Sequence, residues 1–394
     1  MSDSTAGVWD VAIVGAGPAG AAAALAALSE RPTARVLLLD RDDFPRDKSC
    51  GDGIAPHVLD VLEPLGAADV VDGWEPLQEL ELSRGVNVVR GRMARPVHVI
   101  PREVFDARLV ERAVAAGACL VRHRVRKVQV EGAVVVLDGE VRARTVIGAD
   151  GAQSAVRAAL SAPTRGRVAL AIRGYAPTPP ERAGSQVIRY GLGPSQPSYA
   201  WAFDRGDGLS NVGYGELVGD DRALTRQLLL DRLEELLPGT VEHGTRWRAH
   251  HLPLSGRGWR REQPDGPVLF AGDAAGLINP MTGEGIYYAV ATGALAGATA
   301  VTATFGSGRD SAGAQYRATV RALLNRHLQH TWVAAGLTTR PAVVDAGITG
   351  ARRNHRTFDD LVELGLGDGR LTPRLVASLA TSLARNQLIR TGGR

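Results

Sequence analysis

Cysteine and lysine are almost absent from this chain of 394 residues, which contains two of each: Cys50, Cys119, Lys48 and Lys127. Two cysteines cannot build a disulfide framework, and no signal peptide precedes the first apolar segment, so we expect a cytoplasmic protein. Hydrophobic residues at 44% and charged residues at 22% are ordinary for a globular fold, and the chain is long enough for two domains.

Because lysine is rare, arginine supplies nearly all of the positive charge, and the formal net charge is only +4. The arginines are scattered and lack interleaved aromatic residues, which argues against a nucleic-acid partner. Arginine exceeds the acids in the segment from Arg309 onward. We interpret that segment as a solvated helical surface in preference to a site for anionic lipids, and peripheral contact with a membrane stays open.

Long uncharged stretches are also rare, and the one that we weigh as a membrane span runs from Gly285 to Gly308. It is longer than the ~20 residues that cross a bilayer, but Ala, Gly and Thr dominate it. These residues gain little from contact with lipid and suit close packing. We therefore predict a buried helix and no transmembrane span.

Motifs of several common enzyme classes are missing. The nine histidines, which include the adjacent His250 and His251, show no metal-ligand spacing such as H-E-x-x-H, and no G-x-S-x-G sequence occurs. Neighbouring residues of a strand point to opposite faces, so this histidine pair is unsuited to one metal ion. We predict no metal site.

The strongest motif lies near the start of the chain. Gly15, Gly17 and Gly20 form G-x-G-x-x-G between an apolar run and an Ala/Leu stretch, and Asp40 ends the next apolar run. In a strand–turn–helix unit, these glycines allow a tight turn, close approach of the backbone to a pyrophosphate and close helix–strand packing, and the acid can bind a ribose. The spacing predicts a dinucleotide-binding site.

Two distant segments decide which dinucleotide we expect. A second nucleotide fingerprint is absent, and further glycine-rich turns occur instead in GADGAQSAVR (residues 148–157) and LFAGDAAGLINPMTGEGIYYA (residues 269–289). Asp273 can bind the hydroxyls of a ribityl chain. Amides at the helix start near Gly285 and Ile286 can face the flavin edge that becomes negative on reduction. We therefore expect FAD.

The apolar patterns divide the chain. Continuous apolar runs separated by a helix predict a parallel sheet covered on both faces, whereas alternation within 77–100 and 168–252 predicts a mostly antiparallel sheet. We expect an α/β fold with a Rossmann-like FAD-binding domain, an inserted substrate domain that holds the antiparallel sheet, and a helical C-terminal region. The predicted FAD-binding parts are residues 1–76, 101–164 and 263–309, the substrate-domain parts are 77–100 and 165–262, and the C-terminal region is 310–394.

Together these motifs resemble the FAD-dependent fold shared by aromatic hydroxylases of the p-hydroxybenzoate type, flavin halogenases and geranylgeranyl reductases. The resemblance covers most of the chain: GAGPAG with Asp40, PREVFDARL with Arg102 and Asp106, GADG, and GDAAG…NPMTGEG. It implies a set of FAD-binding residues spread over these segments: Gly15, Gly17, Ala19, Gly20, Asp40, Arg41, Cys50, Gly51, Arg102, Val125, Asp150, Gly151, Gly272, Asp273, Gly283, Gly285 and Ile286.

The stretch FPRDKSCGDG (residues 44–53) is similar to the geranylgeranyl reductase branch and its menaquinone-reducing relatives, in which a P-R-x-K-x-C-G-x-G loop follows the second strand. By resemblance, the loop lies beside the flavin ring. Cys50 then either shapes the pocket or delivers a proton in catalysis, and Lys48 either binds a flavin or substrate oxygen or is solvated. Asp52 either caps the following helix or contacts substrate.

A second match to that branch is SYAWAFDRGDGLSNVGYGEL (residues 198–217), which is similar to its strand pair Y-x-W-x-F-P…G…N-(I/V)-G-x-G, with Asp204 where proline is usual. Tyr199, Trp201 and Phe203 alternate and so point to one face of a strand. We interpret them as an apolar wall of the substrate pocket. The alternative is ordinary packing within the sheet.

The resemblance implies an FAD-dependent oxidoreductase that reduces carbon–carbon double bonds of an isoprenoid or similarly hydrophobic substrate, with NAD(P)H or a reduced electron-carrier protein as external reductant. The alternative is a flavin-dependent monooxygenase that hydroxylates or epoxidises an aromatic or terpenoid product, because both chemistries use the same scaffold. A flavin-binding or lipid-carrier protein without turnover is a third hypothesis.

Overall fold

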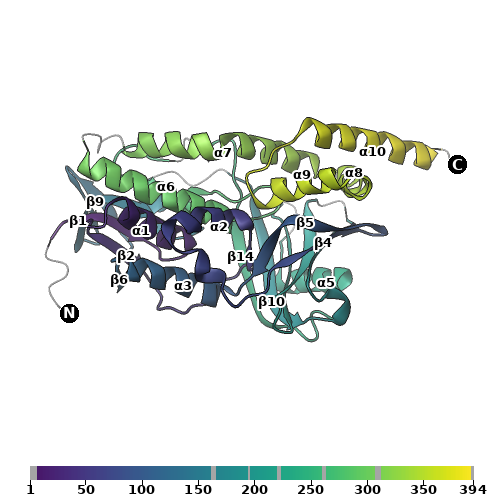
Figure 1. Ribbon diagram of the computed structural model, residues 1–394, viewed down its shortest axis with the longest axis horizontal. Coiled ribbons are helices and arrows are strands. Elements are labelled where there is room, and N and C mark those ends of the chain that lie inside the picture. The colour runs from purple at the N-terminus through teal and green to yellow at the C-terminus, as the bar shows by residue number, and fades with distance from the viewer. Residues whose placement is uncertain are drawn as a thin grey trace.

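The computed structural model describes residues 7–160, 166–193, 196–219, 223–259, 263–306 and 312–391. It contains two β-sheets, and a layer of long helices leads across the molecule to the C-terminus (Figure 1). The predicted α/β fold is confirmed, with a Rossmann-like sheet, a second and mostly antiparallel sheet, and a helical C-terminal region.

The first sheet contains the predicted strand–turn–helix unit. Its parallel core has the order β6-β2-β1-β9, with β15 beside the second half of β9, while β8 and β7 extend it as an antiparallel meander. The register pairs Val14 with both Leu39 and Gly148, so β1, β2 and β9 end at one edge. The strands are β1 (Trp9–Val14), β2 (Val36–Asp40), β6 (Cys119–Arg122), β7 (Val128–Glu131), β8 (Val134–Leu137), β9 (Val141–Gly148) and β15 (Val268–Phe270).

Helices cover the first sheet and continue beyond it. In Figure 1, α6 and α7 run above α1, and α8 to α10 follow towards the C-terminus over the second sheet. The helices are α1 (Pro18–Glu30), α2 (Pro56–Leu62), α3 (Arg102–Ala115), α4 (Ala155–Leu160), α5 (Arg226–Leu236), α6 (Ile286–Phe305), α7 (Ala312–Leu337), α8 (Pro341–Arg353), α9 (His355–Leu366) and α10 (Pro373–Thr391), with the 3₁₀ helices η1 (Glu63–Leu65), η2 (Ala68–Val71), η3 (Pro180–Arg182) and η5 (Gly272–Ala275).

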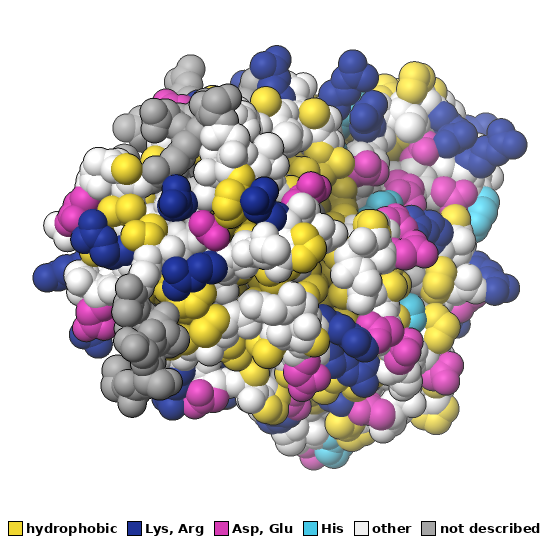
Figure 2. Space-filling model, turned by 60° about the vertical axis from the view of Figure 1, so that its left-hand side comes forward, with side chains coloured by type: hydrophobic (Ala, Val, Ile, Leu, Met, Phe, Trp, Pro, Cys, Tyr) yellow, Lys and Arg dark blue, Asp and Glu magenta, His cyan; other side chains and the backbone are white. Residues whose placement is uncertain are grey.

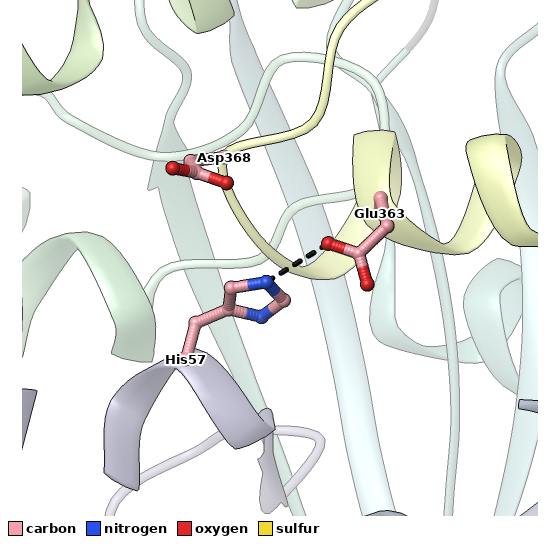
Figure 3. A group of neighbouring side chains, drawn as sticks. All are labelled: His57, Glu363 and Asp368. Carbon is pink, nitrogen blue, oxygen red and sulfur yellow. Dashed lines mark hydrogen bonds and ion pairs between the residues drawn. The ribbon is translucent and has the colours of Figure 1, made fainter. Parts of the chain in front are cut away.

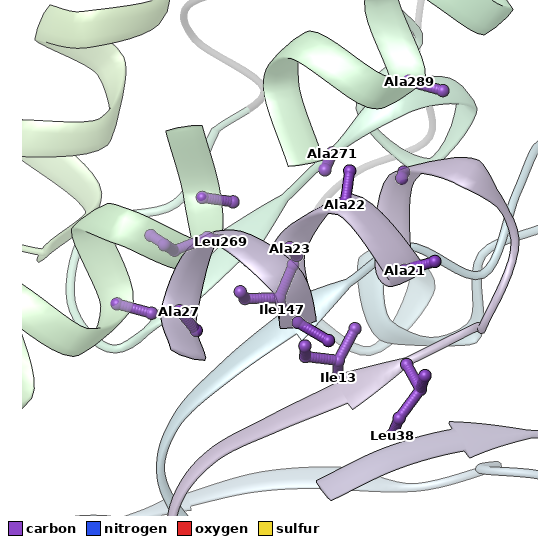
Figure 4. Close-up of a cluster of buried hydrophobic side chains, with 14 of the residues drawn as sticks. Ile13, Ala21, Ala22, Ala23, Ala27, Leu38, Ile147, Leu269, Ala271 and Ala289 are labelled. Atoms are coloured by element: carbon purple, nitrogen blue, oxygen red, sulfur yellow. The ribbon is translucent and has the colours of Figure 1, made fainter. Parts of the chain in front are cut away.

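Helices α1 and α6 approach each other closely beside the first sheet, and Figure 4 shows alanines of α1 packed between this sheet and α6. A Cβ atom at Gly293 would lie 2.1 Å from the carbonyl oxygen of Ala19, and one at Gly297 would lie 2.0 Å from that of Ala23. Only glycine fits at such a distance. In the described chain, α6 is the helix long and apolar enough to cross a membrane, but 72% of its apolar window is buried inside the protein, as expected for a core helix.

The second sheet is antiparallel except for the pair of β11 and β4. Helix α5 covers one face, where Val187 and Ala202 join a buried cluster with Leu229. Ile188, the neighbour of Val187, packs instead with a cluster that includes Val344 of α8, so α8 lies on the opposite face. In spatial order the strands are β14 (Thr245–Pro253), β10 (Val168–Pro177), β13 (Leu209–Leu217), β12 (Ser198–Asp204), β11 (Ser185–Tyr190), β4 (Leu77–Arg84), β5 (Asn87–Val99) and β3 (Gly53–Ile54).

The segments that we expect to form the substrate domain supply every strand of the second sheet except β3. The expected boundaries at 164, 262 and 309 fall on positions outside the described ranges, as does Arg309, where the arginine-rich segment begins. On the face shown in Figure 2, arginine and lysine side chains are interspersed with acidic ones and form no continuous basic stripe.

Candidate active site

A cavity of about 790 Å³ lies where the two sheets and the C-terminal helices meet. All of the predicted site residues line it except Gly20 and Gly272. Gly20 serves packing, because a Cβ there would lie 1.8 Å from the carbonyl oxygen of Gly15. Gly272 has a left-handed backbone with φ of 57° and lies against Ala289 of α6. The fold therefore gathers turns that are far apart in the sequence around one space.

The first glycine turn has the features of a phosphate site at the start of α1. Gly15 has φ of 98°, and a Cβ there would lie 2.4 Å from the carbonyl oxygen of Ala149. A Cβ at Gly17 would lie 3.4 Å from a guanidinium nitrogen of Arg46 and 4.0 Å from one of Arg102. Two positive side chains thus stand beside a helix N-terminus, an arrangement that suits a pyrophosphate.

Two acids lie at the carboxyl ends of β2 and β9, the parallel strands on either side of β1. Asp40, 7% exposed, accepts a hydrogen bond from the amide of Ala16 at 2.8 Å. Asp150 accepts one from the amide of Ala155 at 2.7 Å through Oδ2, whereas its Oδ1 is buried without a hydrogen-bond partner among the described residues. Burial raises the pKa of Asp150. A buried acceptor of this kind is costly unless a ligand donates to it, so Asp150 fits a ligand hydroxyl or amide.

Arg102 begins α3 and is fixed by a bidentate pair with Asp106, at 2.6 and 2.8 Å. The two side chains are 4% and 0% exposed. Residues four apart are neighbours on a helix, so the carboxylate sets the orientation of the guanidinium within the cavity wall. Arg46 contacts the same carboxylate at 3.3 Å, and the two arginines therefore share one buried negative charge.

The third turn follows β15 and is tied to the loop of residues 44–53. The ammonium of Lys48 lies 3.3 Å from the carboxylate of Asp273. Burial raises the pKa of Asp273, but the charge of Lys48, its hydrogen bond to the carboxylate and the charge of Arg102 together lower it more, and the pKa lies below its usual value. The ionised carboxylate can accept hydrogen bonds from ligand hydroxyls. Lys48 is thus paired in the cavity wall and only partly solvated.

Glu284 adds an acid at the start of α6 that sequence reasoning did not single out. One of its carboxylate oxygens accepts a hydrogen bond from the amide of Tyr287 at 3.0 Å. Burial raises the pKa of Glu284 to about 7, although hydrogen bonds from the helix amides act in the opposite direction. The helix N-terminus expected to face a flavin therefore carries a group that can gain or lose a proton near neutral pH.

The Cys50 loop is anchored to the second sheet through Asp52, which is 0% exposed. The carboxylate of Asp52 accepts hydrogen bonds from the Tyr175 hydroxyl at 2.6 Å and from the Asn211 amide at 2.8 Å. Asn211 also donates to the carbonyl oxygen of Cys50 at 2.8 Å. Asp52 is therefore not the helix cap that we considered, since residue Ala55 takes the N-cap position of α2 without a side-chain hydrogen bond.

Two titratable groups of this loop hold protons more tightly than usual. Burial raises the pKa of the Cys50 thiol, and the positive charge of Arg102 offsets this only in part. Burial also raises the pKa of Asp52 to about 6, against the hydrogen bonds from Tyr175 and Asn211 that favour its ionised form. At neutral pH Cys50 is therefore a neutral thiol.

Tyr199, Trp201 and Phe203 form one row along the cavity, with ring centroids 6.0 and 6.5 Å apart. The indole NH of Trp201 donates to the side-chain oxygen of Asn211 at 2.8 Å, and a Cβ at Gly51 would lie 3.5 Å from the Phe203 ring. The aromatic row therefore packs beside the Cys50 loop in the cavity wall.

A group of charged residues around Asp47, which lines the cavity, gave no recognisable signal in the sequence. Asp47 receives ion pairs from Arg173, from Arg248 at 3.0 Å and from Arg246 at 3.6 Å. Arg173 is 1% exposed and comes from β10, far from the loop in sequence. These residues can be identified only from the ion pairs that they form in the folded structure.

A separate group of possible metal ligands lies outside this cavity, at the junction of α2 and α9. His57, Glu363 and Asp368 offer ligand atoms within 4.8 Å of one another, and Figure 3 shows the first two linked by a hydrogen bond. The Nε2 atom of His57 lies 2.9 Å from the Glu363 carboxylate. Because Glu363 has this partner already, we interpret the group as a link between the C-terminal helices and the first part of the chain.

We expect Asp273→Ala to lower the flavin content of the purified protein several-fold, because the substitution removes the carboxylate expected at the ribityl chain and leaves Lys48 without its partner. Asp273→Asn keeps the shape and one acceptor oxygen, and should retain more flavin. The ratio of flavin absorbance to protein absorbance measures the effect. Purification of a fully yellow and fully active Asp273→Ala protein would count against this placement.

Comparisons with known proteins show the family and the fold of this chain. The sequence model of an FAD binding domain matches residues 8–189. A menaquinone reductase from Mycolicibacterium smegmatis is 34% identical over 313 residues, which cover 73% of this chain and 75% of that protein. A digeranylgeranylglycerophospholipid reductase from Methanopyrus kandleri is 34% identical over 317 residues, or 75% and 81% of the two chains.

The fold is that of a solved structure of a geranylgeranyl bacteriochlorophyll reductase-like protein from Thermoplasma acidophilum, with a TM-score of 0.77 and 20% identity over 97% of this chain and 99% of the other. The fold and the site thus define an FAD-dependent oxidoreductase of the p-hydroxybenzoate-hydroxylase-like superfamily. Within that class, the chain belongs to the geranylgeranyl reductase family, together with the menaquinone and digeranylgeranylglycerophospholipid reductases. FAD is its cofactor, and an external reductant must reduce the flavin again after each turnover.

Proposed function

We propose that the protein reduces carbon–carbon double bonds of an isoprenoid or similarly hydrophobic substrate. The observation that carries this proposal is that the residues suited to FAD and a row of aromatic side chains line the same cavity. The names of the relatives, which refer to a menaquinone and to a geranylgeranyl lipid, support a substrate of this class.

The reaction makes particular demands on the residues around the substrate. When bound and reduced, FAD supplies a hydride. An isolated alkene accepts hydride poorly, so a proton must reach the second carbon before or together with it, and bulk water must be kept out. The row of Tyr199, Trp201 and Phe203 offers ring faces that disfavour water, and its one hydroxyl, on Tyr199, is held by the carbonyl oxygen of Thr282 and so is less available to trap a developing cation. We assign the proton to the Cys50 thiol, which stays protonated at neutral pH because burial raises its pKa.

Product mass tests this function directly. The chemically reduced holoenzyme is mixed with polyprenyl alcohols and with aromatic polycycles, with and without oxygen, and the products are analysed by mass spectrometry. Reduction adds two hydrogens without needing oxygen. Oxygen-dependent gain of one oxygen atom would establish the monooxygenase alternative, and an unchanged mass under all conditions would favour a carrier protein.

We expect Trp201→Ala to lower kcat/KM by about tenfold or more, a loss of ~1.4 kcal/mol in transition-state binding, because it opens the water-excluding wall. Flavin content should stay near that of the wild type. Trp201→Phe keeps a ring in the wall and loses only the hydrogen bond to Asn211, so its effect should be smaller. Loss of the flavin itself from Trp201→Ala would show that the indole belongs to the core of the fold.

A further inference from the structure

The cavity extends beyond the flavin turns and the Cys50 loop into the C-terminal region. There its lining comes from α8, α9 and α10, and none of the described residues that these helices contribute is charged or polar. We call this part the apolar arm. The helices that supply this lining lie outside residues 8–189, to which the FAD binding domain corresponds. Its wall includes Val343, Val344, Ile348, Leu361, Leu375 and Leu379.

The aromatic row leads from the Cys50 loop to the apolar arm. It continues past Tyr199 to Tyr190 of β11, with ring centroids 6.1 Å apart. Tyr190 in turn packs against the buried cluster that contains Val344 and Ile348 of α8. Burial raises the pKa of both tyrosines, so the row stays uncharged at neutral pH. The wall is therefore continuous from the site of the reaction to α8.

Gly347 keeps the arm open. It lies within α8 and lines the cavity, and a Cβ there would meet only the Cδ2 atom of Leu379, at an ordinary contact distance of 3.8 Å. A glycine inside a helix costs ~1 kcal/mol relative to alanine. At Gly293 a backbone contact requires glycine, but at Gly347 no such contact exists. What Gly347 provides is space in the arm.

We propose that the apolar arm binds the hydrocarbon tail of the substrate beyond the double bond that reacts, and that Gly347 sets how long a tail can be accommodated. This inference rests on the proposed reduction of an isoprenoid substrate. A chain of isoprene units is apolar along its whole length, which matches an uncharged aliphatic wall. Each methylene that enters such a wall strengthens binding by roughly fourfold.

The test compares the binding of geraniol, farnesol and geranylgeraniol to the oxidised holoenzyme by titration calorimetry. Wild-type affinity should rise with chain length. In Gly347→Leu, affinity for geranylgeraniol should fall at least tenfold while affinity for geraniol changes less than twofold. Gly336→Leu is the matched control, because Gly336 is exposed on α7, lies outside the cavity lining and has open space around it.

A second variant tests the same arm in the opposite direction. Leu379→Ala enlarges the space beside Gly347, and combined with Gly347→Leu it should restore part of the affinity for geranylgeraniol. If Gly347→Leu lost equal affinity for all three alcohols, or kept the length dependence of the wild type, this proposal would be overturned. The proposed function would still stand as long as the wild-type enzyme reduced a polyprenol. If the wild-type holoenzyme bound none of the alcohols and reduced none of them, both proposals would fail.

Discussion

Arg102→Ala should lower the free energy of unfolding by about 3–5 kcal/mol and sharply reduce the FAD content. The magnitude is that expected when one partner of a buried ion pair is removed, because Asp106, 0% exposed, then loses its bidentate partner. The cofactor is affected as well, since a guanidinium nitrogen of Arg102 lies beside Gly17 at the start of α1. Urea unfolding of the holoenzyme and the absorbance of bound flavin measure the two effects.

The same helix offers a matched control. Arg112 pairs with Asp69 at the surface, where the two side chains are 48% and 40% exposed. Exposed ion pairs contribute ~0–1 kcal/mol, so Arg112→Ala should leave the midpoint of unfolding and the flavin content almost unchanged. Similar losses of stability and flavin in both variants would mean that the buried ion pair contributes no more than the exposed one.

Cys50→Ala should lower turnover by roughly a hundredfold, the usual contribution of a positioned general acid, while flavin content stays normal. The substitution keeps the backbone carbonyl that accepts a hydrogen bond from Asn211, so the loop retains its anchor. Cys119→Ala, on β6 and outside the cavity, is the control and should retain full turnover.

The pH dependence separates a proton donor from a residue that only shapes the pocket. A donating thiol must be protonated, so turnover should fall as pH rises through the pKa of Cys50, which burial raises above the usual range. Cys50→Ala should lack this fall. If Cys50→Ala kept turnover within twofold of the wild type and an unchanged pH profile, Cys50 would only shape the pocket.

The sequence predicted the local structure that short-range patterns determine. The G-x-G-x-x-G spacing located the first turn, because turn geometry and helix dipole act over a few residues. The alternation of Tyr199, Trp201 and Phe203 predicted a shared face, and in the structure they line the same cavity, while Ala200 and Ala202 pack against the α5 cluster. The small residues of 285–308 predicted a buried helix, which α6 confirms over Ile286–Phe305.

Contacts between distant strands were not predictable from the sequence. Asp52 meets Tyr175 and Asn211 only because β10 and β13 pair in one particular register, which no local pattern fixes. The role of Asp204, which stands where the family usually has proline, could also be identified only from the structure. Its carboxylate accepts hydrogen bonds from the amides of Gly184 and Gly206, so it ties down the turn where proline is usual.

The apolar arm could not be predicted from the sequence for a different reason. In α8 to α10, apolar residues that line the cavity also pack in buried clusters, so the apolar pattern does not reveal which of them border an open space. Leu375 and Leu379, for example, belong to a packed cluster with Ala334 and Leu364 and also line the cavity. Only the arrangement of several helices distinguishes lining from packing.

The glycines of α6 have a mechanical consequence. At Gly293 and Gly297 the main chains of α1 and α6 touch without side chains between them, so no rotamer change can alter their spacing. The turns that open these two helices are the ones that we expect to bind the pyrophosphate and the flavin edge of FAD, and the contact between the helices fixes the spacing of these turns. The C-terminal helices meet the rest of the protein through aliphatic side chains and through polar contacts such as His57–Glu363 and Arg84–Asp345. We therefore expect these helices, and not α1 and α6, to adjust when a long substrate binds.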